Sequence, residues 1–289
     1  MAVIAVDCGG TNLRVGWRER AGGPGPTVSV PTPPEVGGLP DAILSCIADL
    51  PPARAVGVGV AGLVDHAAGR VRWMLHRPGT AAIAEVVGAG AGLPVVVDND
   101  ANTVSLAEAT AGAGVGYRVV LAVTVGTGIG GGLAVDGSIE RGRGHLGEIG
   151  HMSMDPHGER CACGAIGCWE VTASGRALDR GAAGLGLADG AALMAAAAGG
   201  EVAAGRLVGE VAAAFGRGLA NLVAILDPDV IVVGGGVVAA GEVFLSPARR
   251  ALAAALSGGS HRRPTPVVAA RFGPAAGIVG AALMAGAPL

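Results

Sequence analysis

Three cysteines and a histidine lie close together in the middle of the chain. They are His151, Cys161, Cys163 and Cys168. One imidazole and three thiolates form a complete tetrahedral ligand set for structural zinc, although the Cys-x-Cys spacing is tighter than the usual Cys-x-x-Cys. Gly164 and Gly167 give this segment the freedom to wrap around a metal ion. Spacing leaves two questions open, because the thiols are also compatible with a metal-free cluster, and His145 or His157 stands close enough to replace His151.

Two carboxylates flank this cluster. Glu148 precedes His151 by three residues, and Glu170 follows Cys168 by two. A segment organised by a metal would hold both side chains in place, and carboxylates so placed can accept hydrogen bonds from a polyhydroxy ligand. Spacing alone favours this interpretation no more than the alternative, in which both carboxylates are solvated charges on a loop.

A second polar cluster, Asp98-Asn99-Asp100, ends an apolar run and opens a helical pattern. Helix capping is one explanation, since an Asp at the N-cap is common and stabilises a helix by about 1 kcal/mol. Capping needs only one of the three side chains. The cluster therefore leaves a carboxylate available to act as a general base.

Three glycine-rich turns, at 7–12, 126–132 and 234–236, each follow an apolar run. Glycine has no Cβ, so backbone N–H groups can approach phosphate oxygens there, and Thr11 or Thr127 adds a hydroxyl donor. One such turn is weak evidence in a chain with 53 glycines, but three directly after strands predict a nucleotide site. Asp7 would hold the magnesium ion of that nucleotide, through water. The nucleotide-binding candidates are Asp7, Gly9, Gly10, Thr11, Asn12, Gly126, Thr127, Gly128, Gly130, Gly234, Gly235 and Gly236.

The composition excludes several enzyme classes. All 20 basic residues of this 289-residue chain are arginines, so no lysine amine is available. Walker-type phosphate loops, protein kinases, pyridoxal-phosphate enzymes and Schiff-base aldolases all need that amine. The net charge of −3, without basic runs, argues against nucleic acid as a partner.

Nothing in the sequence predicts a membrane segment or a secretory leader. The longest uncharged stretches, 119–135 and 272–289, are interrupted by Gly or Pro and would make poor spanning helices. The residues at 1–6 include no basic residue ahead of an apolar stretch. We therefore expect a cytoplasmic protein, in which clustered cysteines indicate a metal rather than disulfides.

Apolar runs and helical patterns alternate along the chain. We expect strands at 2–6, 13–17, 55–60, 94–97, 119–125, 133–135 and 230–233, and helices at 41–50, 100–113, 200–226 and 275–284. This alternation predicts an α/β protein with mainly buried sheets. The strand–turn–strand pattern at 2–17 recurs at 119–135, which indicates a duplicated domain whose two halves face one another across a cleft.

These segments together resemble the ROK family (repressor, open reading frame, kinase) of the actin-like ATPase superfamily. The resemblance covers almost the whole chain, and the pairing of Gly-Glu-Ile-Gly-His at 147–151 with the three-cysteine segment at 161–170 is its most specific part. The other matching motifs are 7–12, 57–65 (Gly-Val-Gly-Val-Ala-Gly-Leu-Val-Asp), 99–102 (Asn-Asp-Ala-Asn), 126–132 and 233–237.

The resemblance implies a two-domain α/β fold of the actin-like ATPase (ribonuclease H-like) type, with ATP and a hexose in the cleft between the domains. The small domain would comprise 1–112 and 274–289, and the large domain 113–273 with the zinc-binding segment 151–170. By analogy, Asp100 is the catalytic base, and the sugar-holding set is Asn99, Asp100, Glu148, His151 and Glu170. His151 would also be the fourth zinc ligand, and magnesium would accompany ATP. Phosphoryl transfer depends on alignment and charge neutralisation, so such a site needs no lysine.

The resemblance to zinc-containing bacterial glucokinases makes glucose the expected acceptor. Ala61 stands where proline is frequent, and 75–80 (Leu-His-Arg-Pro-Gly-Thr) departs from the family pattern beside the sugar. Kinases of N-acetylmannosamine, N-acetylglucosamine or fructose are therefore alternatives. So is a polyphosphate-using kinase, although those relatives usually lack the three-cysteine segment.

Two non-catalytic functions are alternatives to the kinase. A sugar-sensing regulator of the same family usually has a winged helix-turn-helix ahead of the kinase-like part, whereas only six residues precede Asp7 here. A catalytically dead sugar-binding protein would be expected to lose Asp100 or a phosphate turn, and all are present. The expected partners are thus ATP and a small-molecule sugar, with no nucleic acid and no membrane, in a homodimer or homotetramer.

Overall fold

The computed structural model describes residues 2–18, 27–258, 261 and 263–286. Contacts divide the chain into two compact units. The first comprises Met1–Val115, Gly132–Gly147 and Pro274–Leu289, and the second comprises Gly116–Gly131 and Glu148–Gly273. The sequence-based boundaries placed 132–147 in the large domain instead, because nothing in the sequence marks a change of unit in the middle of a strand.

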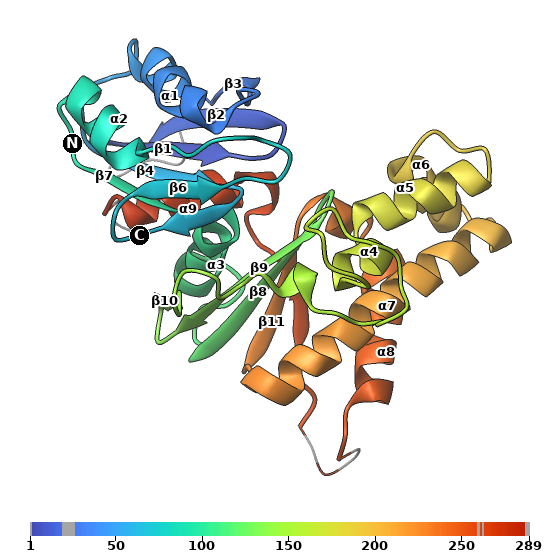
Figure 1. Cartoon of the computed structure of the whole chain (residues 1–289). Coiled ribbons are helices and arrows are strands. Elements are labelled where there is room, and N and C mark those ends of the chain that lie inside the picture. The colour runs from blue at the N-terminus through green and yellow to red at the C-terminus, as the bar shows by residue number, and fades with distance from the viewer. Residues whose placement is uncertain (1, 19–26, 259–260, 262, 287–289) are drawn as a thin grey trace. The chain divides into compact units, whose positions relative to one another are not determined.

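The first unit is built on a five-stranded sheet in the order β3-β2-β1-β4-β7 (Figure 1). Its strands are β1 (Ala2–Cys8), β2 (Asn12–Arg18), β3 (Val28–Pro31), β4 (Ala53–Val60) and β7 (Val95–Asn99). β1, β4 and β7 run parallel, and the register pairs Asp7 with Gly59 and Gly59 with Asp98. Two strand spacings, about 10 Å, therefore separate the Asp7 and Asp98 backbones at the same edge of the sheet.

Helices cover both faces of this sheet (Figure 1). On one face, α1 (Leu39–Ile47) and α2 (Ile83–Ala91) pack onto the apolar strands, together with the ribbon of β5 (Leu63–Asp65) and β6 (Arg70–Trp73). On the other face lie α3 (Asp100–Ala111) and α9 (Ala276–Met284). α9 approaches the strand end closely because Gly277 has no side chain; a Cβ there would lie 2.7 Å from the carboxyl carbon of Asp7.

The second sheet repeats the strand order of the first. It runs β10-β9-β8-β11-β12, where the strands are β8 (Val119–Val125), β9 (Ile129–Val135), β10 (Ser138–Glu140), β11 (Val230–Gly234) and β12 (Val267–Ala269). β8, β11 and β12 are parallel, as β1, β4 and β7 are. This shared order is what the duplicated strand–turn–strand pattern predicts.

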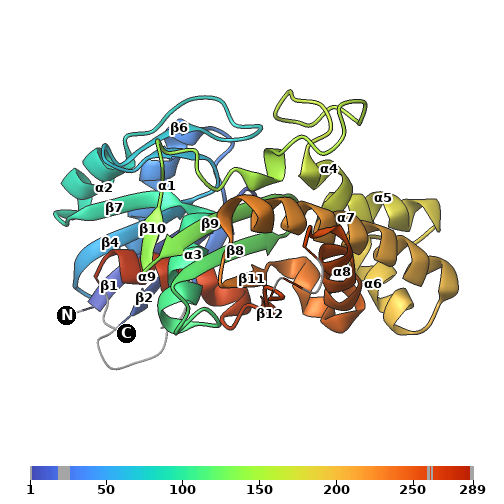
Figure 2. The ribbon, with the colours of Figure 1, turned by 90° about the horizontal axis from the view of Figure 1, so that it is seen from below.

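The second unit contains α4 (Trp169–Ala173), α5 (Gly175–Gly184), α6 (Gly190–Ala198), α7 (Val202–Leu226) and α8 (Glu242–Ala255). α7 and α8 run side by side (Figures 1 and 2). Trp169 stacks on Phe215 with ring centroids 5.1 Å apart, and Phe215 meets Phe244 at 5.5 Å. α7 is long and apolar enough to cross a membrane, but half of its apolar window is buried in the protein, as in the core helix of a folded domain.

Four short 3₁₀ helices complete the described elements. They are η1 (Val36–Gly38), η2 (Ile149–His151), η3 (Gly236–Ala240) and η5 (Gly273–Ala275). η2 lies inside the 147–151 motif, and η3 begins at Gly236, the last residue of the third glycine-rich turn, so the backbone tightens at both places.

Candidate functional site

Asn99, rather than either neighbouring aspartate, is the N-cap of α3. Its side-chain oxygen accepts hydrogen bonds from the N–H groups of Ala101 at 2.8 Å and Asn102 at 3.2 Å. Its Nδ2 donates to the carbonyl of Gly62 at 3.0 Å. Asp100 follows as the first helical residue. Oδ1 of Asp100 also accepts from the Ala101 N–H, at 2.9 Å, but Asn99 already caps the helix, so the cap does not need a carboxylate at position 100.

Asp98 is a buried carboxylate held from several directions. Its Oδ2 lies 2.7 Å from Nε of Arg141 and 3.6 Å from Nδ1 of His66. Its Oδ1 accepts from the Asn99 N–H and from Nδ2 of Asn102, both at 2.8 Å. Its side chain is only 3% exposed. This network fixes the backbone that carries Asn99 and Asp100. Arg141 is the member of the network that the sequence did not predict.

Replacing Arg141 by methionine should destabilise the protein by about 3 kcal/mol, because it leaves the Asp98 carboxylate buried without its guanidinium. Urea denaturation monitored by circular dichroism measures this loss. Arg143→Met is the matched control, since Arg143 lies two residues away and is exposed. Equal stability of the two variants would show that the Arg141–Asp98 pair contributes little.

The turn between β1 and β2 is held by its own backbone and by an arginine. The Gly9 N–H donates to the carbonyl of Asn12 at 3.0 Å, and Nη2 of Arg77 donates to the carbonyl of Gly10 at 2.7 Å. A second strand end tightens the turn further, because the Thr32 N–H donates to the carbonyl of Thr11 at 2.9 Å. All five candidates from Asp7 to Asn12 thus lie at one end of the first sheet.

Burial dominates the protonation of the residues that lead into this turn. Desolvation raises the pKa of Asp7, and the guanidinium of Arg14, 3.9 Å away, acts in the opposite direction. Burial, and then the negative charges of Asp7 and Asp100, raise the pKa of the Cys8 thiol to about 12. Cys8 is therefore a neutral core thiol, as the sequence suggested for an isolated cysteine.

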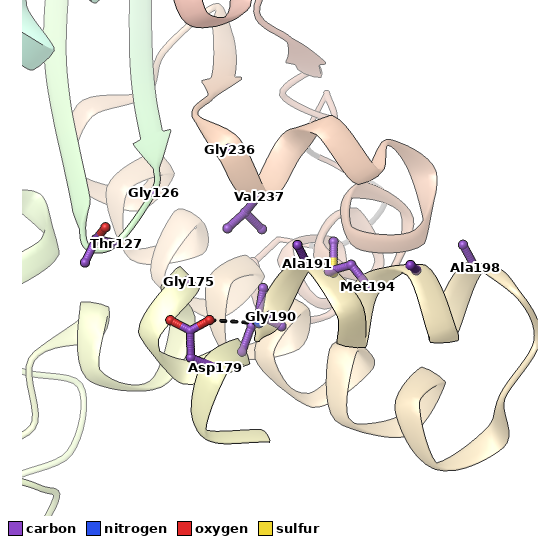
Figure 3. Close-up of a pocket in the computed structure, with 12 residues that line it drawn as sticks. Gly126, Thr127, Gly175, Asp179, Gly190, Ala191, Met194, Ala198, Gly236 and Val237 are labelled. Carbon is purple, nitrogen blue, oxygen red and sulfur yellow. Dashed lines mark hydrogen bonds between the residues drawn. The ribbon is translucent and has the colours of Figure 1, made fainter. Parts of the chain in front are cut away.

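The other two glycine-rich turns meet in a pocket of the second unit with a volume of about 650 Å³ (Figure 3). Gly126, Thr127 and Gly236 line it. Gly235 brings the turns together, because its φ of +92° suits glycine and a Cβ there would lie 2.4 Å from the carbonyl oxygen of Val125. The remaining candidates of these turns are not among the residues that line the pocket. They are Gly128, Gly130 and Gly234.

Helix α5 begins against the first of these turns. The Gly175 N–H donates to the carbonyl of Gly126 at 2.8 Å, and a Cβ on Gly175 would lie 2.5 Å from that oxygen. α5 and α6 complete the pocket with the side chains of Leu178, Asp179, Ala191, Met194, Ala195 and Ala198, while Val237 closes it from η3. Sequence reasoning missed this half of the pocket, because its alanine-rich helices show no chemical motif.

The four residues proposed as zinc ligands come together in the structure. Their ligand atoms all lie within 4.8 Å of one another. Sγ of Cys161 is 3.7 Å from Nδ1 of His151, and Sγ of Cys163 is 3.7 Å from Sγ of Cys168. Tetrahedral zinc with bonds of about 2.3 Å places sulfur pairs about 3.8 Å apart, so the donors fit that ion. Among the described residues the cluster includes His151, and neither His145 nor His157 belongs to it.

Two carboxylates adjoin this cluster on opposite sides of the His151 ring. Oε2 of Glu148 lies 3.8 Å from Nε2, and Oε1 of Glu170 lies 3.8 Å from Nδ1. Glu170 also contacts the glycine-rich turn at 126–132, because its Oε2 accepts from the Ile129 N–H at 3.3 Å. Trp169 anchors this carboxylate: its ring is fully buried, and its indole N–H donates to the carbonyl of Ala214 at 3.1 Å.

The candidate residues thus fall into one group in each unit. The first unit contains Asp7 to Asn12 together with Asn99 and Asp100. The second contains the glycine-rich turns at 126–132 and 234–236 together with Glu148 and Glu170. It also contains the His/Cys cluster, which is formed by His151, Cys161, Cys163 and Cys168. Each group consists of residues far apart in the sequence that the fold brings close together.

A sequence model of the ROK family matches residues 3–287. The chain belongs to the ROK family. It is 37% identical to a glucokinase of Streptomyces coelicolor, over 99% of this chain and 98% of that protein. It is 32% identical to an N-acetylmannosamine kinase of Salmonella paratyphi A, also over 99% and 98%.

A solved structure of this family has the same fold. The structure of a ROK family glucokinase from Streptomyces griseus, in complex with glucose and AMPPNP, superposes with a TM-score of 0.89 at 38% identity, and the match covers 99% of both chains. The expected α/β fold of the actin-like ATPase type is therefore confirmed, as is the family resemblance on which it rested.

Proposed function

We propose that this ROK-family protein, an ATP-dependent sugar kinase, transfers the γ-phosphoryl group of ATP to the 6-hydroxyl of glucose. The single observation that supports glucose as the acceptor is the whole-length similarity to a glucokinase whose structure holds glucose and AMPPNP. The geometry described above supports the chemistry, since it provides a base candidate, a phosphate-type pocket and a polar side-chain set suited to hydroxyl groups.

In this proposal Asp100 accepts the proton of the sugar hydroxyl as the oxygen attacks the γ-phosphorus. The buried Asp98–Arg141 pair and the Asn99 cap hold its backbone in place. The backbone amides of the turns at 7–12 and 126–132 bind phosphate oxygens, and Arg77 places a positive charge beside the first turn. Alignment and charge neutralisation are what phosphoryl transfer chiefly requires, so these groups suffice without lysine.

Magnesium would arrive with ATP, and Asp7 is the residue that would hold it, through water. Its carboxylate lies at the end of β1, directly before the phosphate-type turn. A bound dication neutralises charge on the phosphoryl group, and it would also favour the ionised form of a carboxyl that burial alone disfavours. The metal would thus add its positive charge to that of Arg77 and Arg14 beside this turn.

The proposed sugar-binding set offers both donors and acceptors. Nδ2 of Asn99 has two hydrogens, and one of them is donated to the Gly62 carbonyl, so the second could be donated to a ligand. Glu148 and Glu170 accept hydrogen bonds from hydroxyl groups. His151 turns Nδ1 toward the thiols and Nε2 toward Glu148, so a metal on Nδ1 would leave Nε2 on the ligand side.

We propose zinc as the ion of the His/Cys cluster, in a structural function. His151, Cys161, Cys163 and Cys168 form a closed set of four protein ligands, which leaves no position for a reacting water. Burial raises the pKa values of the Cys161 and Cys168 thiols, whereas burial of Cys163 is outweighed by hydrogen bonds from the Ala165 backbone and the neighbouring thiols, which lower the pKa of that thiol. A bound cation would favour all three thiolates that the set requires. Such a site needs reduced thiols, in agreement with the cytoplasmic setting that we propose.

A coupled ADP-release assay over a panel of hexoses and amino sugars tests the acceptor. We expect glucose to have the highest kcat/KM, above N-acetylmannosamine, N-acetylglucosamine and fructose. A site built to hydrogen-bond particular hydroxyl groups rejects sugars that lack them by about 10⁴-fold. The competing N-acetylmannosamine assignment is favoured by the similarity to N-acetylmannosamine kinases of several Salmonella strains, each 32% identical, and by the unusual 75–80 segment, in which His76 adopts a left-handed φ of 61°. Preferred turnover of another sugar would overturn the assignment of glucose as the acceptor and would leave the kinase assignment unaffected.

A further inference from the structure

The 650 Å³ pocket of the second unit has two chemically different ends (Figure 3). Gly126, Thr127 and Gly236 form the end made of glycine-rich turns. Met194, Ala195 and Ala198 of α6 form the other end, where the lining is apolar. If the turns bind phosphates, as the proposed function holds, the apolar end is left for the nucleobase and the ribose must lie between them.

Asp179 lies between these two ends. Figure 3 shows it on α5, between Thr127 on one side and the start of α6 on the other. Among the described residues that line the pocket, Thr127 and Asp179 alone have polar side chains, and of these two only Asp179 is ionisable. Thr127 belongs to the phosphate end. The position reserved for the ribose therefore has a single carboxylate beside it.

The start of α6 holds this carboxylate in a defined orientation. Oδ1 of Asp179 accepts from the Gly190 N–H at 2.8 Å, while the cap of α6 is provided by Asp189, whose Oδ1 accepts from the Ala192 N–H at 2.8 Å. Asp179 is thus not needed as the N-cap. In Figure 3 its other carboxylate oxygen points away from Gly190, toward the Thr127 side of the pocket.

We propose that Asp179 binds the ribose hydroxyls of the nucleotide and so makes the enzyme select ribonucleotides over deoxyribonucleotides. A carboxylate only accepts hydrogen bonds at neutral pH, and the vicinal hydroxyls of ribose are donors. An acidic side chain on the ribose is also how dinucleotide-binding folds recognise that sugar. This inference rests on the proposed function, because it assigns the pocket to the nucleotide.

Steady-state kinetics with ATP, 2′-deoxy-ATP and 3′-deoxy-ATP at saturating sugar test the proposal. We expect wild-type kcat/KM to be about 10-fold or more higher for ATP than for at least one deoxy analogue, as for a lost hydrogen bond to a charged group. In Asp179→Ala this preference should shrink to within about twofold, with kcat/KM for that analogue little changed and KM for the sugar unchanged.

Two further variants separate binding from folding. Asp179→Asn keeps an oxygen for the Gly190 N–H but removes the charge, so it should lose most of the preference at wild-type melting temperature. Asp189→Asn retains the cap of α6 and should keep the preference intact.

A wild-type enzyme that uses ATP and both analogues equally would overturn the proposal, as would an Asp179 variant that loses all three donors to the same extent. Absence of sugar phosphorylation by the wild type with any donor would instead refute the proposed function.

Discussion

Asp100→Asn should lower kcat by about 100-fold or more while leaving sugar affinity and thermal stability close to wild type, as expected when a general base is lost. Asparagine has nearly the shape of aspartate but cannot take the proton of the attacking hydroxyl. The helix start should tolerate the change, because the side chain of Asn99 caps α3 and asparagine at position 100 keeps an oxygen for the Ala101 N–H. Coupled ADP-release kinetics, with melting temperature measured in parallel, separate the two effects.

Asp41→Asn is a suitable control for this variant. Asp41 is also an acidic residue in the first turn of a helix of the first unit, in α1, and it is exposed. It should turn over sugar at the wild-type rate. If Asp100→Asn retained near-normal turnover, the base assignment would fail, and the carboxylate at position 100 would need another explanation.

Local sequence was sufficient to predict most of the strands that carry the site. The strands at 2–6 and 119–125 were recognised because parallel strands buried on both faces are continuous apolar runs, and glycine marks where they end. The order of strands in both sheets also agrees with the duplicated pattern. The helices α2, α4, α5, α6 and α8 were not predicted. In α6 the run of alanines shows little contrast between apolar and polar faces, whereas α5 and α8 are amphipathic, so their pattern is present in the sequence.

The partners of the candidate residues could not be predicted in the same way. Arg141 lies 43 residues from Asp98, and Asp179 lies about 50 residues from Thr127, so no spacing rule connects them. An arginine after a short strand is normally read as a surface charge. Only the pairing of β10 with β9 brings it to a buried carboxylate.

The His/Cys cluster could be predicted from the sequence in part: the sequence predicted a metal site, but spacing did not decide which histidine belongs to it. Three thiolates within eight residues limit the possible sites whatever the fold, so the sequence suffices to propose a metal. The choice among three nearby histidines depended on a family resemblance. The structure supports the same choice by geometry, because η2 tightens the backbone at Ile149–His151 and turns the imidazole toward the thiols.

We expect purified protein to contain close to one zinc ion per chain by elemental analysis, and Cys163→Ser to lose most of it. The loss should lower stability by about 3 kcal/mol or more, which is on the order of 6–12 °C in Tm for a chain of this size. The physical reason is that the segment from His151 to Cys168 is mostly turns, with few apolar side chains to hold it in place.

Cys46→Ser is the matched control, since Cys46 is half-buried like Cys163 but stands alone in α1. It should retain its zinc and its Tm. The serine at position 163 keeps the size of the side chain, so a difference between the two variants reports ligation rather than packing.

The activity of the zinc-depleted protein should reveal which half of the site the metal supports. Glu170 follows the proposed ligand Cys168 by two residues, and His151 is itself a proposed ligand, so KM for the sugar should rise steeply. The pocket at Gly126 and Gly236 is built from strands and from α5 and α6, so the affinity for ATP should change much less. Full activity and unchanged Tm in strong chelator, with no zinc found, would contradict the metal site.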